Sequence, residues 1–120
     1  MKLITAYIKP NKLSDVTYAL HEEPSVHGAS LSEGRGFGSW REALSEVERE
    51  WLEINYEPHV RIEIACEDEA VDSIRRCIAK AAHTGRRGDG LVLVTELTQA
   101  YRIGADQETR FIGSKGPSAK

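Results

Sequence analysis

HVRIEIACEDEAVDSIRRCIAKAAHTGRRGDGLVLVTEL, residues 59–97, contains three consecutive elements of secondary structure. Apolar side chains stand at every second position of residues 59–66, which predicts a half-buried strand. Asp68 then precedes an apolar stripe at spacings of three and four, so we expect a helix that ends at Gly85. The segment 91–97, LVLVTEL, predicts another strand because it is rich in strand formers.

The first half of the chain repeats this order. Residues 2–9 alternate along their length and predict a strand that ends at Pro10. Apolar residues recur at helical spacing from Leu13 onward and predict a helix. A strand over 27–33 then enters the glycine cluster at 34–38, where we expect the chain to leave the sheet.

The order strand, helix, strand, long loop, strand, helix, strand predicts an α+β, ferredoxin-like βαββαβ fold with four antiparallel strands and two helices on one face. The long loop spans about 39–57, the domain spans 1–104, and the tail 105–120 is expected to be mobile at its end. Several strands carry apolar groups on both faces. Because a core this small leaves an uncovered sheet marginal, we expect the sheets of several subunits to pack together.

Composition excludes several classes of partner. The net charge is -3, from sixteen basic and nineteen acidic residues, so no basic excess is available to bind nucleic acid. No apolar run approaches the ~18 residues of a membrane span. The first strand lacks the small-residue cleavage site of a signal peptide, so we expect a cytoplasmic protein. In that compartment Cys66 and Cys77 are expected to be reduced, packed thiols.

Four blocks in this order resemble the PII signal-transduction family: TAYIKPNKLSDV (5–16), GRGFG (34–38), PHVRIEIAC (58–66) and AAHTGRRGDG (81–90). The resemblance covers residues 1–103. It implies a homotrimer with nucleotide sites in the clefts between subunits, where ATP and ADP compete. It also implies that the long loop changes conformation with the nucleotide and docks on a transporter, enzyme or regulator.

The segment Thr84–Gly90 is the sharpest candidate for a binding site, since its glycines allow several backbone N–H groups to converge on an anion. No Lys-Ser/Thr pair follows those glycines, so it is not a Walker A loop, and an ordinary glycine-rich connection is the alternative. The ligand implied by the resemblance is ADP, AMP or ATP, with no catalytic cofactor. The candidate nucleotide-binding residues are Ser30, Gly36, Gly38, Ser39, Ala65, Arg86, Arg87, Gly88, Asp89, Gly90 and Arg102.

Compared with the family pattern, three positions have lost a cation: Leu91 replaces a lysine, and Ser39 and Gly104 each replace an arginine. Because every phosphate charge needs a partner, we expect ADP or AMP to be favoured over ATP. Trp40 and His59 replace the glutamine and lysine of the family's 2-oxoglutarate response, so that response is not expected here.

The loop itself differs from the family pattern, because Leu52 stands where many members carry a modified tyrosine, and uridylylation is therefore not expected. The loop has an apolar stripe at helical spacing, with glutamates at most other positions, and is expected to form an amphipathic helix. This stripe either packs on the protein's own surface or is presented to a partner's groove. It consists of Trp40, Leu44, Val47, Trp51 and Ile54.

We therefore predict a non-enzymatic PII-like regulator in nitrogen, carbon or metal homeostasis. One alternative is a CutA-like trimeric metal-tolerance protein, which shares the architecture but lacks the long loop and the GDG turn. A second is a small hydrolase of the acylphosphatase kind, but no Ser-His-Asp set or clear carboxylate pair supplies a nucleophile or base. The histidines and cysteines lack CxxC or HxxxH spacing, so no metal site is predicted. Metal-linked regulation stays a hypothesis because HVRIEIAC and AAHTG resemble a PII subgroup associated with heavy-metal efflux.

Overall fold

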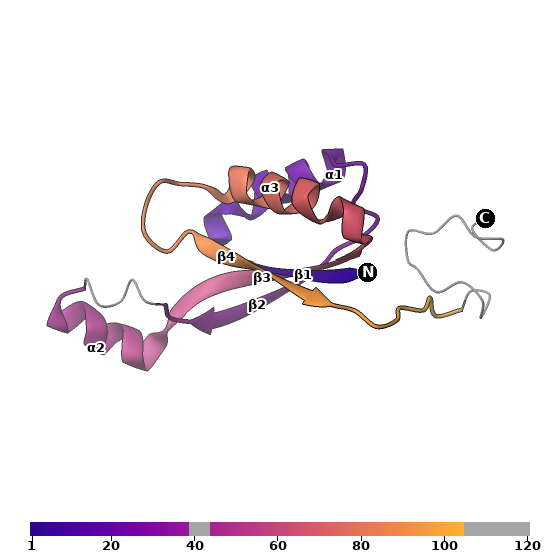
Figure 1. The fold of residues 1–120 in the computed structure, drawn as a ribbon. Coiled ribbons are helices and arrows are strands. Elements are labelled where there is room, and N and C mark those ends of the chain that lie inside the picture. The colour runs from indigo at the N-terminus through magenta and orange to yellow at the C-terminus, as the bar shows by residue number, and fades with distance from the viewer. Residues whose placement is uncertain (39–43, 105–120) are drawn as a thin grey trace.

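The computed structural model describes residues 1–38 and 44–104, which form one sheet and three α-helices (Figure 1). None of the helices in these two ranges is long and apolar enough to cross a membrane. The elements in chain order are β1 (Lys2–Ile8), η1 (Pro10–Lys12), α1 (Leu13–Glu22), β2 (Ser30–Gly36), α2 (Glu46–Asn55), β3 (Glu57–Cys66), η3 (Asp68–Ala70), α3 (Val71–Ala82) and β4 (Gly90–Glu96).

The four strands form an antiparallel sheet in the order β2-β3-β1-β4, which confirms the predicted ferredoxin-like fold. In the centre, Ile4 of β1 pairs with Ile64 of β3 on one side and Val94 of β4 on the other. Helices α1 and α3 lie together on one face of this sheet (Figure 1). The core lies between these two layers.

The core is formed by the alternate strand positions that face the helices, together with the inner stripes of α1 and α3. Ile4, Ile62, Ile64, Ile74 and Val16 are fully or almost fully buried. Burying a side chain of this size contributes about 1.5–3 kcal/mol relative to leaving it exposed. The strands, with apolar residues at every second position, and the helices, with apolar residues every three to four positions, therefore bury these side chains in the same layer from opposite sides.

Two predicted boundaries were wrong. Strand β2 covers Ser30–Gly36 instead of 27–33, so Gly34 lies inside the strand. The ring of His59 packs over Gly34, where an added Cβ would lie 2.8 Å from His59 Nε2, and the missing side chain makes room for that ring. Helix α3 ends at Ala82 instead of Gly85, because the N–H groups of Thr84 and Gly85 bind the Asp89 carboxylate.

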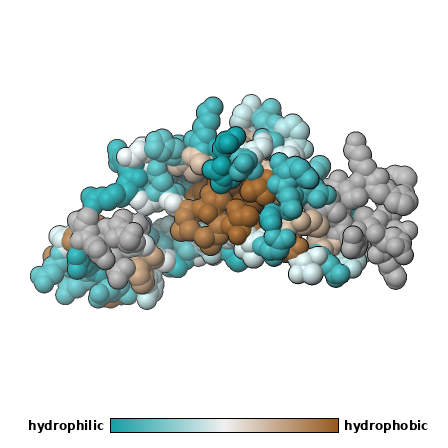
Figure 2. Space-filling view, in the orientation of Figure 1, coloured by the Kyte–Doolittle hydropathy of each residue, from teal (hydrophilic) through white to brown (hydrophobic). Residues whose placement is uncertain are grey.

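The sheet face opposite α1 and α3 is not covered by any described helix (Figure 1). This open face carries the alternate strand positions, with Leu91 and Leu93 of β4 exposed beside half-buried Leu3 and Tyr7 of β1. On the side where β4 forms the sheet edge, apolar surface is also visible between the helices and the sheet (Figure 2). Both surfaces have the apolar character that the sequence predicted for subunit contacts.

Helix α2 lies away from the core, at the end of the ribbon formed by β2 and β3 (Figure 1). A capping box starts the helix, with the Ser45 hydroxyl accepting from the Glu48 N–H and the Glu48 carboxylate accepting from the Ser45 N–H. The predicted loop helix is thus present over 46–55. The predictions for Ser39, Trp40 and the tail 105–120 fall outside the described residues.

Candidate functional site

A cleft of about 740 Å³ lies on the open face, where the end of β2 meets the loop between α3 and β4. Gly36 and Gly38 border it on one side, and Arg87, Gly88 and Gly90 border it on the other. These five residues come from two separate glycine-rich segments, so the fold brings together two blocks that the sequence placed about fifty positions apart. Asp89 also lines the cleft.

The loop between α3 and β4 is held in shape by Asp89. Its carboxylate accepts hydrogen bonds from the N–H of Thr84 at 2.9 Å and of Gly85 at 3.3 Å, and from the Thr84 hydroxyl. Lys9 Nζ and His83 Nδ1 each lie 3.4 Å from one of its oxygens. The Thr84 hydrogen bonds are the largest cause that holds the pKa of Asp89 far below its ordinary value, so this carboxylate is ionised at neutral pH.

This arrangement changes the predicted role of the glycine-rich loop. The N–H groups of Thr84 and Gly85 converge on an anion, but the anion is the chain's own Asp89. The N–H of Arg86 is also used, since it donates to the Thr84 hydroxyl at 3.0 Å. The residues that face the cleft are therefore the later ones, from Arg87 to Gly90, and Arg86 is not among its lining residues.

Gly90 requires glycine for two independent reasons. Its φ is +119°, a conformation that residues with a Cβ rarely adopt. An added Cβ would also lie 1.8 Å from the Tyr7 carbonyl oxygen, far inside any allowed contact. Because Tyr7 and Gly90 both line the cleft, this close approach of β4 to β1 forms part of its lining.

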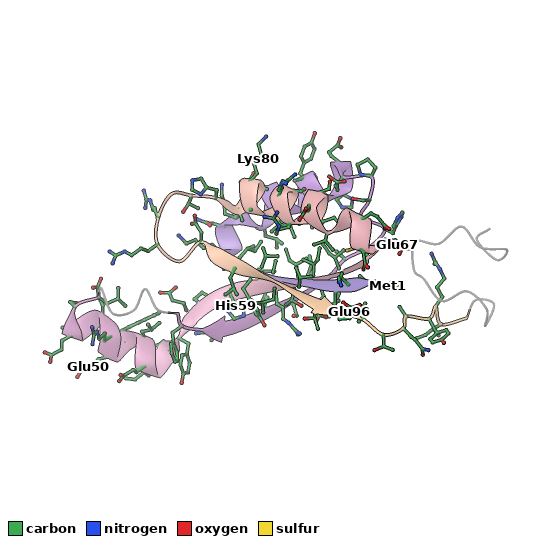
Figure 3. All side chains as sticks on the ribbon, viewed as in Figure 1. Met1, Glu50, His59, Glu67, Lys80 and Glu96 are labelled. Atoms are coloured by element: carbon green, nitrogen blue, oxygen red, sulfur yellow. The ribbon has the colours of Figure 1, made fainter. Side chains whose placement is uncertain are left out.

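The wall of the cleft is largely aromatic and apolar. The rings of Tyr7 and His59 meet edge to face with centroids 5.1 Å apart, and Phe37 and Leu91 complete the wall. Figure 3 shows His59 beneath the start of β4, at the end of the sheet from which the β2–β3 ribbon extends towards α2. Among the described lining residues, Arg87 is the one Lys or Arg. His59 and Leu91 thus occupy the cleft at the two positions where the family pattern has lysine.

The other predicted nucleotide-binding residues lie away from this cleft within the chain. Ser30 is at the start of β2, opposite Glu63, and Ala65 pairs with Leu3 near the far end of the sheet. Arg102 follows β4, whose last residue pairs with Lys2 at that same far end. At about 3.3 Å per residue, Ala65 is ~20 Å along β3 from His59. The candidate residues therefore form two sets. The cradle set lines the cleft and consists of Gly36, Gly38, Arg87, Gly88, Asp89 and Gly90. The far set lies towards the other end of the sheet and consists of Ser30, Ala65 and Arg102.

Helix α2 presents most of the predicted apolar stripe to solvent. Val47 is 75% exposed, Trp51 52% and Ile54 78%. Leu44 is half-buried. The side chain of α2 that is buried is instead that of Leu52, which is 2% exposed.

Several lining residues were missed or given another meaning by the sequence. Tyr7, Phe37 and Glu57 were not predicted to lie at the site, although all three line the cleft. For Phe37 a signal was present, because a large aromatic side chain between two glycines is unusual in a flexible connection. Lys9, which supports Asp89 and Thr84, had no signal beyond its place at the end of a strand.

Other residues raised in the sequence have simple surroundings. Cys66 is buried and Cys77 half-buried, and burial raises the pKa of both thiols. Across residues 1–38 and 44–104, no group of three or more His, Cys, Asp or Glu side chains is arranged to hold a metal ion.

Comparison with known proteins agrees with the residue pattern. The family model described as "Nitrogen regulatory protein P-II" matches residues 1–107. The chain is 37% identical to nitrogen regulatory protein GlnK of Escherichia coli (strain K12) over 103 residues, covering 86% of this chain and 91% of the relative. It is 39% identical to nitrogen regulatory protein P-II of Azospirillum brasilense, again covering 86% and 91% of the two chains.

Proposed function

Because the chain belongs to the nitrogen regulatory protein P-II family, a family of signal-transduction regulators, we propose that it acts as a homotrimer that binds adenine nucleotides between subunits and controls a partner protein through its long loop. The partner is a transporter, an enzyme or a regulator. The CutA-like alternative is not favoured, because the family match is to P-II and α2 occupies the long loop that a CutA-like protein lacks.

The division of the candidate residues into two sets carries this proposal. Gly36, Gly38 and Arg87–Gly90 lie at one end of the open face, and Ser30, Ala65 and Arg102 lie towards the other. A single chain cannot close both sets around one small molecule. A cyclic trimer that buries the open face can place the far set of one subunit against the cradle set of the next.

We expect ADP and AMP to bind more tightly than ATP. The described lining of the cleft has Arg87 as its single fixed cation and Leu91 where a lysine could meet a third phosphate. Hydrogen bonds to charged groups contribute about 1.5–3 kcal/mol each, so one missing cation is enough to change the order of affinities. Isothermal titration calorimetry with AMP, ADP and ATP tests this order, and equal or tighter binding of ATP would contradict it.

The partner surface follows from the charges around the exposed stripe of α2. Val47, Trp51 and Ile54 project from a helix that also carries Glu46, Glu48, Glu50 and Glu53, all exposed. Figure 3 shows Glu50 pointing away from the body of the protein. A complementary partner has an apolar groove bordered by lysines and arginines, with Trp51 as the central anchor. The complex is then expected to weaken as salt increases.

The shared site can be tested by mixing two defective variants. Arg87→Ala removes the cation of the cradle set, and Arg102→Ala removes the cation of the far set. Each variant alone is expected to bind ADP at least tenfold more weakly, since a charged hydrogen bond is lost. After subunit exchange at equal amounts, each site draws its two halves from randomly chosen copies, so about a quarter of the sites regain both arginines.

Sedimentation velocity must show a trimer for each variant before and after exchange. Recovery of tight ADP sites in the mixture supports a site shared between subunits. Two results would contradict the proposal: a monomeric wild-type protein, or a mixture that binds no better than its components.

A further inference from the structure

Phe37 lies between two cavities. It lines the cleft that contains Arg87, and it also lines a pocket of about 320 Å³ beneath α2, together with Arg49, Leu52, Glu53 and Tyr56. Among the lining residues that the structure describes, Phe37 is the one shared by both cavities. A change in the position of the Phe37 ring therefore changes the shape of the cleft and of the pocket beneath α2 at the same time.

The far side of Phe37 is connected directly to the C-terminal end of α2. Its ring stacks on Tyr56, with centroids 5.9 Å apart and planes 15° apart. Tyr56 is the C-cap of the helix: its N–H still donates to the Leu52 carbonyl at 2.7 Å, but its own φ and ψ are no longer helical. It is also the one non-glycine residue with positive φ, 59°, among the described residues. Such a conformation is held by its surroundings and is easily released when they change.

One further contact and one longer-range attraction join α2 to the rest of the protein. The Arg35 guanidinium donates to the Asn55 carbonyl at 2.8 Å, which attaches the end of α2 to the end of β2. The positive charge of Arg87 acts at longer range on Glu48, in the first turn of α2. The pKa of Glu48 is lowered chiefly by its hydrogen bonds with Ser45, and the positive charge of Arg87 lowers it further. The cation of the cleft thus attracts the acidic face of α2.

We propose that Phe37 is the positioning residue through which a nucleotide in the cleft releases α2. A bound phosphate group takes the positive charge of Arg87 away from Glu48, and the nucleotide displaces the Phe37 ring from its stack on Tyr56. Helix α2 then loses an electrostatic attraction at its first turn and an aromatic contact at its C-cap at the same time. This inference rests on the proposed function, because it takes the cleft to be the nucleotide site.

Amide hydrogen exchange of α2 with and without saturating ADP tests the inference, with ADP affinity measured by calorimetry on the same samples. The key variant is Phe37→Leu, which keeps an apolar side chain but removes the ring. Phe37→Tyr restores the ring. Tyr18→Leu is the matched control, since Tyr18 is an exposed aromatic residue on α1, away from the cleft.

In the wild-type protein, ADP is expected to accelerate exchange in α2 by about fivefold or more, the lower end of typical coupling between sites. Phe37→Tyr and Tyr18→Leu should keep this acceleration. Phe37→Leu should exchange faster without ADP and show no further acceleration at ADP concentrations that calorimetry shows to saturate the variant. A purely structural role would change the exchange rate without ADP but leave the response to ADP intact.

If Phe37→Leu does not fold, Tyr56→Leu removes the other ring of the stack and should lose the response in the same way. Two results would overturn the inference alone: ADP binding that leaves α2 exchange unchanged in the wild type, or a full response in both ring-deleted variants. Failure of ADP to bind the wild-type protein would overturn the proposed function, and the linkage with it.

Discussion

Asp89 accepts hydrogen bonds from both the N–H and the hydroxyl of Thr84, five positions earlier in the chain. The two residues close the loop between α3 and β4 into a ring, with Lys9 placed on both of them. The backbone of the glycine-rich loop is therefore shaped before any ligand arrives, and Arg87 belongs to the segment that this ring closes. Preorganisation of this kind reduces the ordering cost that binding must meet.

Asp89→Asn should weaken ADP binding by about tenfold. Asn keeps one acceptor but turns an N–H₂ donor towards donors of the loop, and fixing one additional backbone residue costs about 1–2 kcal/mol, close to the 1.4 kcal/mol of a tenfold change. Calorimetry measures the loss. Asp72→Asn is the matched control, because it removes the same charge from an exposed residue on α3 and should leave affinity unchanged.

The same variant has a predictable dependence on pH. The folded pKa of Asp89 lies below its ordinary value of 3.8, so its stabilising effect is fully present above about pH 5 and is lost as the pH falls below 3.8. With His83→Gln in both proteins, which removes the imidazole 3.4 Å from Asp89, thermal unfolding should show a constant difference in Tm between the forms with and without Asp89→Asn from pH 7 to pH 5. The difference should shrink on further acidification. A difference that grows in acid would contradict the assigned role of the carboxylate.

Leu91→Lys should strengthen ATP binding by roughly tenfold and AMP binding by no more than about threefold. Leu91 lines the cleft and is exposed, so a lysine there can reach a distal phosphate without being buried. Calorimetry with both nucleotides gives the ratio. Tyr18→Lys adds the same charge on α1, and a similar gain in that variant would show a general charge effect instead of a specific contact.

Secondary structure was predicted best where a buried face makes apolar residues recur at a fixed spacing along the chain. Strand β3 and helix α3 were predicted within a few residues because Ile62, Ile64, Ile74 and Ile78 all face one core. Strand β2 was misplaced because it lies at the sheet edge, where its side chains are exposed or half-buried and leave no alternating pattern. Glycines in the sequence suggested an exit from the sheet, whereas Gly34 makes room for the ring of His59.

At the site, the sequence indicated which residue types gather but not how they are paired. The loop from Thr84 to Gly90 was predicted from its own glycines, Gly36 and Gly38 were predicted through the resemblance, and Gly36, Gly38 and Arg87–Gly90 line the cleft. The self-closure of the loop by Asp89 depends on three-dimensional geometry that no spacing encodes. The place of Phe37 between two cavities likewise depends on how far α2 folds back towards the β2–β3 ribbon, which is a property of the tertiary structure.

Gly90→Ala should destabilise the protein by more than about 3 kcal/mol, because it combines a positive φ with a clash of Cβ against backbone. The added Cβ would lie 1.8 Å from the Tyr7 carbonyl oxygen, which belongs to a central strand and cannot move freely. Chemical denaturation measures the change. Gly28→Ala is the control, since no atom lies within 4 Å of the added Cβ there. Similar losses in both variants would contradict this account of Gly90.

The two faces of α2 should respond differently to truncation. Leu52→Ala removes the buried anchor of the helix and should accelerate amide exchange throughout α2 by at least about tenfold, because α2 is then held mainly by the Phe37–Tyr56 stack and the Arg35 contact. The global Tm should change little, since Leu52 is not part of the core between the sheet and α1 and α3. Val47→Ala removes a similar apolar side chain from the exposed face and should leave exchange unchanged or slower, because alanine is the better helix former. Faster exchange in Val47→Ala than in Leu52→Ala would mean that the stripe, and not Leu52, holds the helix to the protein, and the stripe would then no longer be available to a partner.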